Sequence, residues 1–280
     1  MTIADRGAAA EPPAPLSIVE DTEASCRTAT NGAATICYRV EGEGPLVLLI
    51  ASTGRGTGEF GALARRLAER GHRVLRPEPR GIGGSVGPME GVSFHDFADD
   101  CAAVIRAEGG GPAIVAGHAF GNWIARTVAL DHPALTRGVV LVAAASRHAP
   151  KALSDAITMI SDPAATEEQR LDGLRLGFFA EGSDPRPWLA GWHRAVLESQ
   201  RAARKRTDDA EWWGAGTAPV LDLQAGSDPF RPAASRRELR DELGDRVTVA
   251  EIAGASHALP AEKPQAVADA IADWAARLER

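Results

Sequence analysis

The chain has 280 residues, of which 44% are hydrophobic and 25% charged, and its formal net charge is −7. Length and composition of this kind are ordinary for one large α/β domain that buries a sizeable core. The acidic balance leaves no surplus of Lys and Arg to neutralise phosphates, which argues against nucleic acid or an anionic membrane as the partner.

The first residues do not resemble a targeting segment. Residues 1–22, a tail and lead-in to the first strand, lack the charged region and apolar core of a signal peptide. The chain has no run of about 18 apolar residues, so no membrane span is predicted. Its cysteines, Cys26, Cys37 and Cys101, are odd in number and form no CxxC pair. We therefore expect reduced thiols in a cytoplasmic protein, with neither a disulfide scaffold nor a zinc site.

Strands and helices then alternate along the chain. Polar and apolar residues alternate at residues 26–30 and 34–40, which predicts an antiparallel hairpin at one edge of a sheet. Continuous apolar runs follow, separated by amphipathic segments, and such alternation predicts a parallel sheet with helices on both faces. The predicted elements span residues 45–51, 59–70, 72–77, 94–107, 112–116 and 137–145, and then 219–225, 233–243, 247–252 and 264–278.

Residues 148–216 interrupt this alternation. They are helical in pattern, bounded by Pro and Gly, and rich in tryptophan. That arrangement is typical of a helical lid inserted after the sixth strand. It divides the predicted core into residues 23–147 and 217–280.

The sequence from Gly117 to Gly121 changes from a strand to a helix within five residues. A tight turn between strand and helix, with glycine two positions either side of its centre, is the frame of a nucleophile elbow. Glycine is expected at both positions because side chains there would meet the neighbouring strand and helix. The central residue usually carries the nucleophile, most often Ser, but here it is Ala119, whose methyl group cannot attack a substrate.

Two further motifs join the elbow. Asp228 lies just beyond a predicted strand, and His257 lies in the loop before the last predicted helix. The order nucleophile, acid, histidine and the alternating pattern resemble the α/β-hydrolase-fold superfamily from about residue 23 to the end of the chain. The resemblance implies a mostly parallel, doubly wound sheet with an inserted helical lid. It also implies a hydrolase for a small apolar ester, lactone or related acyl compound.

The resemblance assigns roles to residues of this chain. Asp228 would hold the imidazole of His257 in one tautomer, and His257 would remove a proton from the nucleophile or from water. The backbone N–H groups of Phe120 and Thr53 would form the oxyanion hole. Because these donors belong to the backbone, an Ala in place of Ser at position 119 leaves them intact.

Three interpretations of Ala119 stay open at this point. In the first, an introduced Ser→Ala substitution inactivates an ordinary hydrolase. In the second, Ala119 is native, and Asp228 and His257 act directly on water or on a substrate proton, which allows hydrolysis or a lyase, cyclase or isomerase reaction. In the third, the protein is a non-catalytic receptor for a small molecule. The retained Asp–His pair argues against the receptor.

Other side chains near these motifs indicate what the site binds. Ser52 and Thr53 follow the third predicted strand, and their hydroxyl groups either face the site or only shape the oxyanion loop. Arg55 is a candidate for binding a substrate carboxylate, with a salt bridge to an acidic residue of the lid or rim as the alternative. The basic run at residues 201–206 is interpreted as a solvated helix face. The aromatic residues predicted to line an apolar pocket are Phe178, Trp212 and Trp213.

The sequence predicts no metal and no organic cofactor. No His, Cys or Asp cluster has the spacing of metal ligands, and no phosphate-binding glycine loop follows the first strand. The predicted partner is a small-molecule substrate, and a homodimer is left open.

Overall fold

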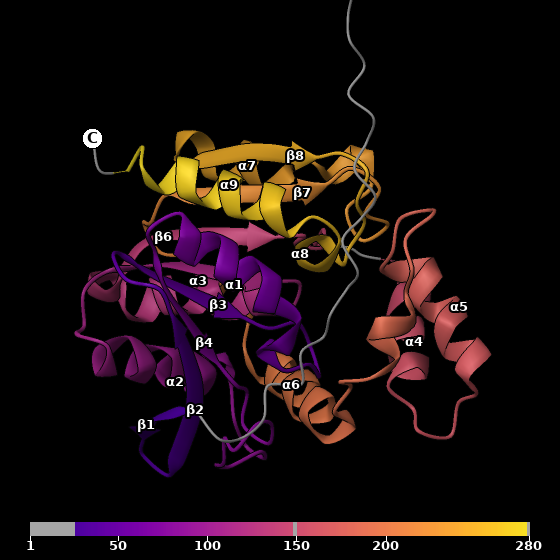
Figure 1. The fold of residues 1–280 in the computed structure, drawn as a ribbon. Coiled ribbons are helices and arrows are strands. Elements are labelled where there is room, and N and C mark those ends of the chain that lie inside the picture. Colours follow the sequence, from indigo (N-terminus) through magenta and orange to yellow (C-terminus); the bar gives the residue numbers. More distant parts are fainter. Residues whose placement is uncertain (1–25, 148–149, 279–280) are drawn as a thin grey trace, which may run out of the picture.

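A computed structural model describes residues 26–147 and 150–278, and the tail predicted at residues 1–22 lies outside them (Figure 1). Within the described residues, the strands form one eight-stranded sheet in the order β1-β2-β4-β3-β5-β6-β7-β8. Strand β2 is antiparallel to both of its neighbours, and all other neighbouring strands are parallel. This mostly parallel sheet with flanking helices confirms the predicted fold class.

The described strands are β1 (Arg27–Asn31), β2 (Ala34–Glu41), β3 (Leu46–Ile50), β4 (Arg73–Pro77), β5 (Ala113–His118), β6 (Thr136–Val142), β7 (Val220–Ala225) and β8 (Val247–Ile252). The α-helices are α1 (Gly61–Glu69), α2 (Phe94–Ala107), α3 (Gly121–Asp131), α4 (Lys151–Ile160), α5 (Glu167–Gly177), α6 (Arg194–Arg206), α7 (Glu238–Leu243), α8 (Leu259–Glu262) and α9 (Pro264–Ala275). Short 3-10 helices are η2 (Thr57–Phe60), η3 (Pro133–Leu135), η4 (Arg186–Leu189), η5 (Asp209–Glu211), η6 (Ala233–Ser235) and η7 (Gly244–Arg246). None of the described helices has the length and apolar character needed to cross a membrane.

Strand β5 shows why the central strands are apolar throughout. Ala113 and Val115 pack into the core on the face that α2 and α3 cover, and Ile114 and Ala116 pack into the core on the face of α1 and α9 (Figure 1). Successive side chains of a strand point to opposite faces, so a strand covered on both sides needs an apolar residue at every position. Each fully buried Val or Ile side chain contributes about 1.5–3 kcal/mol. The buried centre of the sheet thus supports the turn that follows β5.

The helices between β6 and β7 form a separate group at one end of the sheet. We call the segment from α4 to η5 the helical insertion. In Figure 1 it lies on the side toward which the arrows of β6 and β8 point. The carboxyl ends of parallel strands are where open α/β sheets bind ligands. The position fits the predicted lid, and the function of a lid stays a prediction.

The prediction of three reduced cysteines is wrong at the first hairpin. Cys26, just before β1, and Cys37 in β2 form a disulfide, with their Cα atoms 5.5 Å apart. The antiparallel register pairs Thr28 with Cys37, so the chain just before β1 lies diagonally opposite Cys37. The register of a hairpin is not visible in the spacing of its cysteines. Cys101 is free and buried, and burial raises the pKa of its thiol.

Candidate active site

The chain turns sharply between β5, which ends at His118, and α3, which begins at Gly121. Ala119 at the centre has φ of 47°, a left-handed conformation that residues other than glycine rarely adopt. A Cβ atom at Gly117 would lie 2.0 Å from the carbonyl oxygen of Gly121, and one at Gly121 would lie 2.3 Å from that of Ile50. Both positions therefore require glycine, and the backbone has the geometry of the predicted elbow.

His257 and Asp228, 29 residues apart in the sequence, are in contact. Nδ1 of His257 lies 2.9 Å from Oδ2 of Asp228, and both side chains are almost fully buried. The ring of Phe230 stacks on the imidazole, with centroids 4.0 Å apart, and the N–H of Phe230 donates to Oδ1 of Asp228 at 2.8 Å. Because a carboxylate only accepts, Nδ1 of the neutral ring carries the hydrogen and Nε2 becomes its basic nitrogen.

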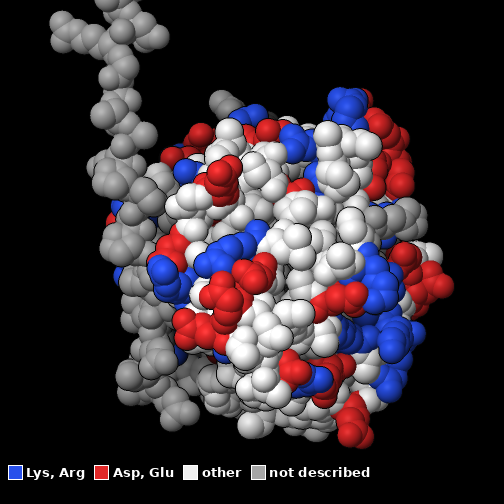
Figure 2. Space-filling model, turned by 90° about the vertical axis from the view of Figure 1, so that its right-hand side faces the viewer, with Lys and Arg blue, Asp and Glu red and all other residues white. Residues whose placement is uncertain are grey.

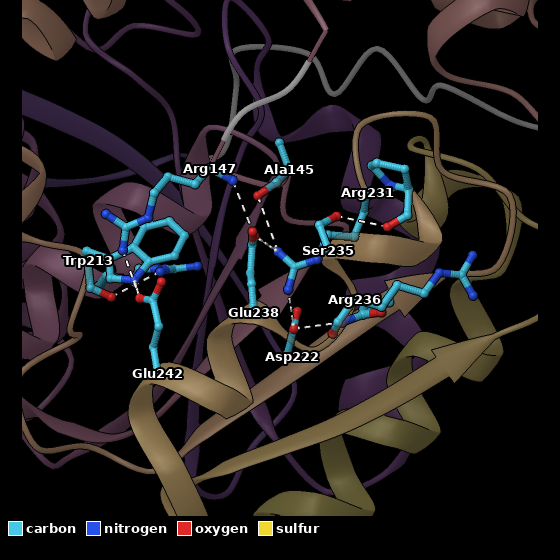
Figure 3. Close-up of polar contacts among 12 residues, drawn as sticks. Ala145, Arg147, Trp213, Asp222, Arg231, Ser235, Arg236, Glu238 and Glu242 are labelled. Atoms are coloured by element: carbon cyan, nitrogen blue, oxygen red, sulfur yellow. Dashed lines mark hydrogen bonds and ion pairs between the residues drawn. The ribbon is translucent and has the colours of Figure 1, made fainter.

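A buried cation anchors the loop that carries Asp228. Arg231, which is 1% exposed, donates to Oδ2 of Asp222 at 2.8 Å and to Oε1 of Glu238 at 2.9 Å. Figure 3 shows its guanidinium between these two carboxylates, with the carbonyl oxygen of Ala145 beside it. Arg231 therefore ties this loop to β7, to α7 and to the segment after β6. An ion pair withdrawn from solvent in this way limits the movement of Asp228.

The two predicted oxyanion donors lie in the wall of one cavity. Thr53 and Phe120 both line it, and within the described chain neither backbone N–H group has a protein acceptor. Gln200 of α6 holds the first donor's loop in place. Its Oε1 accepts from the N–H of Gly54 at 2.8 Å and from Oγ1 of Thr53 at 3.1 Å. Unpaired N–H groups, one of them at a helix N-terminus, can receive the negative charge of a tetrahedral intermediate.

Glu59, to which no role was predicted, connects three parts of the site. Its buried carboxylate accepts from the N–H of Ser52 at 3.3 Å and from Nε of Arg55 at 2.8 Å, and lies 3.1 Å from Nδ1 of His118. Burial raises the pKa of Glu59, but the hydrogen bond and charge of His118, with those of Arg55, outweigh burial and lower it. Nε2 of His118 donates in turn to the main-chain oxygen of His257. Contacts this distant in sequence have no signal in any local motif.

The prediction that Arg55 binds a substrate carboxylate is corrected by its position. Arg55 is 2% exposed, and its guanidinium packs on the rings of Trp188 and Trp192, at 4.2 and 4.9 Å from their centroids. It donates to the carbonyl oxygen of Ala190 as well as to Glu59. The salt bridge foreseen as the alternative exists, but its partner is in η2, not on the lid or the rim. Arg55 therefore connects the helical insertion, through Trp188, Ala190 and Trp192, to Glu59 of the core.

Ala119 and His257 line the same cavity, which has a volume of about 490 Å³. Ser52 and Phe178 line it as predicted. Its size lies within the range of small-molecule sites, which is about 300–1,000 Å³. Among the described residues, no group of three or more His, Cys, Asp or Glu side chains could hold a metal ion.

The two tryptophans predicted to line the cavity lie behind its wall. Trp212 is 2% exposed and packs on Trp123, which does line the cavity, with ring centroids 5.5 Å apart. Trp213 is also buried, and its indole N–H donates to Glu242. Both belong to the core cluster on the α2 and α3 face. The prediction failed because a tryptophan beside glycines can turn toward either the core or a cavity, and composition does not distinguish them.

A family model described as "Alpha/beta hydrolase family" matches residues 47–270, which include the elbow, Asp228 and His257. The rhodomycin D methylesterase DauP of Streptomyces sp. (strain C5) is 28% identical over 269 residues, which cover 82% of this chain and 90% of the relative. A 2-(acetamidomethylene)succinate hydrolase of Mesorhizobium japonicum is 35% identical over 111 residues. That match spans 40% of this chain and 40% of the relative.

Solved structures have the same fold over most of their length. An esterase from Thermogutta terrifontis, solved with malate bound, superposes with a TM-score of 0.72 at 22% identity, covering 92% of this chain and 100% of that structure. The structure of E-2-(acetamidomethylene)succinate hydrolase gives a TM-score of 0.70 at 24% identity, with 89% of this chain and 98% of that structure covered. At these identities the similarity establishes the fold alone.

Proposed function

The chain belongs to the alpha/beta hydrolase family, and we propose that it hydrolyses a small apolar ester, lactone or related acyl compound with water as the attacking group. Named relatives are hydrolases, one of them a methylesterase. One observation carries the proposal. A histidine hydrogen-bonded to a buried aspartate lines the same cavity as Ala119 and two unpaired backbone N–H groups.

The proposed reaction uses the basic Nε2 of His257. It takes a proton from water, and the water oxygen bonds to the carbonyl carbon of the substrate. The carbonyl oxygen becomes an oxyanion that the N–H groups of Phe120 and Thr53 receive. Asp228 stabilises the imidazolium, which then returns its proton to the leaving alkoxide as the bond from carbon to that oxygen breaks. The products are a carboxylic acid and an alcohol.

The residue at position 119 determines whether water attacks the substrate directly or an acyl-enzyme forms first. The methyl group of Ala119 cannot form an acyl-enzyme, so hydrolysis proceeds in one displacement instead of two. We take Ala119 as part of the working enzyme, since neither the Asp–His pair nor the backbone oxyanion donors need a side chain at position 119 to act on water. A general base alone contributes about 10²–10⁴-fold to the rate, so we expect slow turnover compared with a serine hydrolase.

The walls of the cavity support an apolar substrate. Trp123, Phe178, Phe230 and Ile157 line it. Ile157 belongs to α4, and Phe178 directly follows α5. Gln200 of α6 also lines the cavity, where it accepts a hydrogen bond from Thr53. We therefore assign to the helical insertion the function of a lid over the substrate.

A turnover assay with His257→Ala tests the proposal. We expect the wild-type protein to hydrolyse members of a panel of p-nitrophenyl esters and aryl lactones, and the variant to lose about 10²–10⁴-fold in kcat. His132→Ala is the matched control, because His132 pairs with Asp99 at 2.8 Å and does not line the cavity. Equal rates for wild type and His257→Ala on every hydrolysed substrate would contradict the proposed base, and no hydrolysis of any member of the panel by the wild type would favour a receptor.

A further inference from the structure

The cavity is positively charged, although the chain carries a net charge of −7. Four cationic side chains line it, and among its described lining residues there is no Asp or Glu. In Figure 2, which faces the side of the molecule with the helical insertion, Lys and Arg side chains gather toward one edge of that face. The four lining cations are Arg147, Arg201, Arg204 and Lys205.

Carboxylates outside the cavity neutralise two of these four cations. Arg147 binds Oε2 of Glu242 at 2.8 Å. Arg204 forms an ion pair with Asp209 of η5. The charges of Arg147 and Arg204 are therefore largely satisfied by the protein itself.

Among the described residues, neither Arg201 nor Lys205 has a carboxylate partner. The guanidinium of Arg201 donates to Oγ1 of Thr158 at 2.9 Å and to the carbonyl oxygen of Ser154 at 3.2 Å, both on α4. Two neutral acceptors orient the group without cancelling its charge, and three of its five N–H donors stay available. Lys205 is exposed at the cavity, and within the described chain its ammonium has no ion pair and no hydrogen bond.

The two carboxylates whose charges act on Arg201 already form ion pairs with other cations. Asp155 binds Lys151 at 2.7 Å, and Glu198 binds Arg194 at 3.0 Å. Burial and the charge of Arg194 lower the pKa of Arg201, and they outweigh the charges of Glu198 and Asp155, which raise it. A cation that is partly desolvated and repelled by a neighbour gains more from a bound anion than a fully hydrated one does.

We propose that Arg201 and Lys205 bind a carboxylate of the substrate at the α6 side of the cavity. The two residues are four apart on α6, so their side chains project from the same face of the helix. The planar fork of Arg suits a carboxylate, and the apolar wall nearby suits the body of a compact acid. The inference rests on the proposed function and narrows its substrate to an acyl compound with an apolar body and one carboxylate, which replaces a wholly apolar substrate.

Binding of a matched pair of probes tests the site without any turnover. Isothermal titration with 3-phenylpropionate and with the neutral 3-phenylpropionamide compares a carboxylate and an amide of the same shape. We expect the carboxylate to bind at least about tenfold more tightly to the wild type, and Arg201→Gln and Lys205→Gln each to remove most of that preference. The preference should also weaken as the salt concentration rises.

Matched controls remove a cation elsewhere. Arg175→Gln and Lys263→Gln change exposed or peripheral residues that do not line the cavity, and they should keep the preference. Arg201→Lys retains the positive charge and should retain part of the preference for the carboxylate. This variant keeps the test valid if Arg201→Gln does not fold. Equal affinity for acid and amide, or an equal loss in the control variants, would overturn the proposal. His257→Ala should keep the preference while it loses turnover, so the two proposals fail separately.

Discussion

Nε2 of His118 donates a hydrogen bond of 2.7 Å to the main-chain oxygen of His257. His118 directly precedes Ala119, so a single imidazole spans the gap between the elbow and the loop of the proposed base. Nδ1 of the same ring faces Glu59, and the ring is fully buried. The distance from the elbow to His257 is therefore set by a side chain that does not line the cavity.

His118→Phe should lower both stability and turnover. The substitution leaves the main-chain oxygen of His257 without its partner, and Oε1 of Glu59 keeps only the N–H of Ser52. A buried unsatisfied group costs about 1–3 kcal/mol. We expect kcat to fall with little change in KM, because the substrate does not contact His118. Urea unfolding measures the loss of stability, and steady-state kinetics measure the loss of kcat. Both losses should be smaller in His118→Gln than in His118→Phe, because the amide can still donate a hydrogen bond. A variant with unchanged kcat would show that this contact does not position His257.

Asp228→Asn tests the orientation of the proposed base. An amide can donate to Nδ1 and so stabilise the wrong tautomer of His257, and we expect kcat to fall by up to about 10⁴-fold with the fold unchanged. Asp99→Asn makes the same change beside His132 and should leave kcat unaltered. Circular dichroism confirms folding of both variants. Comparable rates for the two would argue against a role for Asp228.

Residues whose function depends on local pattern could be predicted from the sequence. The glycines of the elbow, the apolar run of β5 and the loop positions of Asp228 and His257 each have a local signature, and the strand order of the fold brings these residues together. The sheet confirms the fold that these signatures predict. Features encoded within a single segment were therefore predictable.

Residues whose function depends on packing between distant segments could not be predicted. Arg55 lies in a glycine-rich loop in the sequence, but tryptophans 133 and 137 residues further along the chain bury it, as its ring contacts show. Glu59 looks like an ordinary helix-start acid until His118 approaches it. The basic run of α6 indicates a solvated helix face in the sequence, but Arg201, Arg204 and Lys205 line the cavity, which a linear pattern does not show.

Glu59→Gln should reduce stability in a manner that depends on pH. The folded-state pKa of Glu59 is lowered, so its contribution is fully present above the unfolded-state pKa of about 4.3 and is lost as the pH falls through the folded value. At neutral pH the variant leaves Arg55 buried without its charge partner, which should cost about 3–5 kcal/mol. Urea unfolding from pH 7 to pH 3 should show the difference from wild type shrinking with acidity. Glu69→Gln, an exposed partner of Arg66, is the control and should show a small difference throughout.

Gly121→Ala should prevent the elbow from forming. The added Cβ would lie 2.3 Å from the carbonyl oxygen of Ile50, and backbone atoms cannot move away cheaply. We expect a loss of more than about 2 kcal/mol in the free energy of unfolding. Gly61→Ala is the control, because Gly61 has helical φ and ψ and no atom within 4 Å of the added Cβ. It should be neutral or stabilising by about 0.4–1 kcal/mol, and a similar loss for both variants would contradict the steric argument.

The most direct test asks whether the protein ever carries the acyl group. Wild type and Ala119→Ser are each mixed with a p-nitrophenyl ester and quenched in acid during turnover. Intact-protein mass spectrometry then measures whether the mass of the chain has increased by one acyl group. We expect no adduct on the wild type, because water attacks the substrate, and one acyl adduct at position 119 of the variant, because His257, Asp228 and the oxyanion donors are already in place. An acyl adduct on the wild-type chain, at Ser52 or Ser146, which both line the cavity, or elsewhere, would contradict hydrolysis by water and replace it with a covalent mechanism.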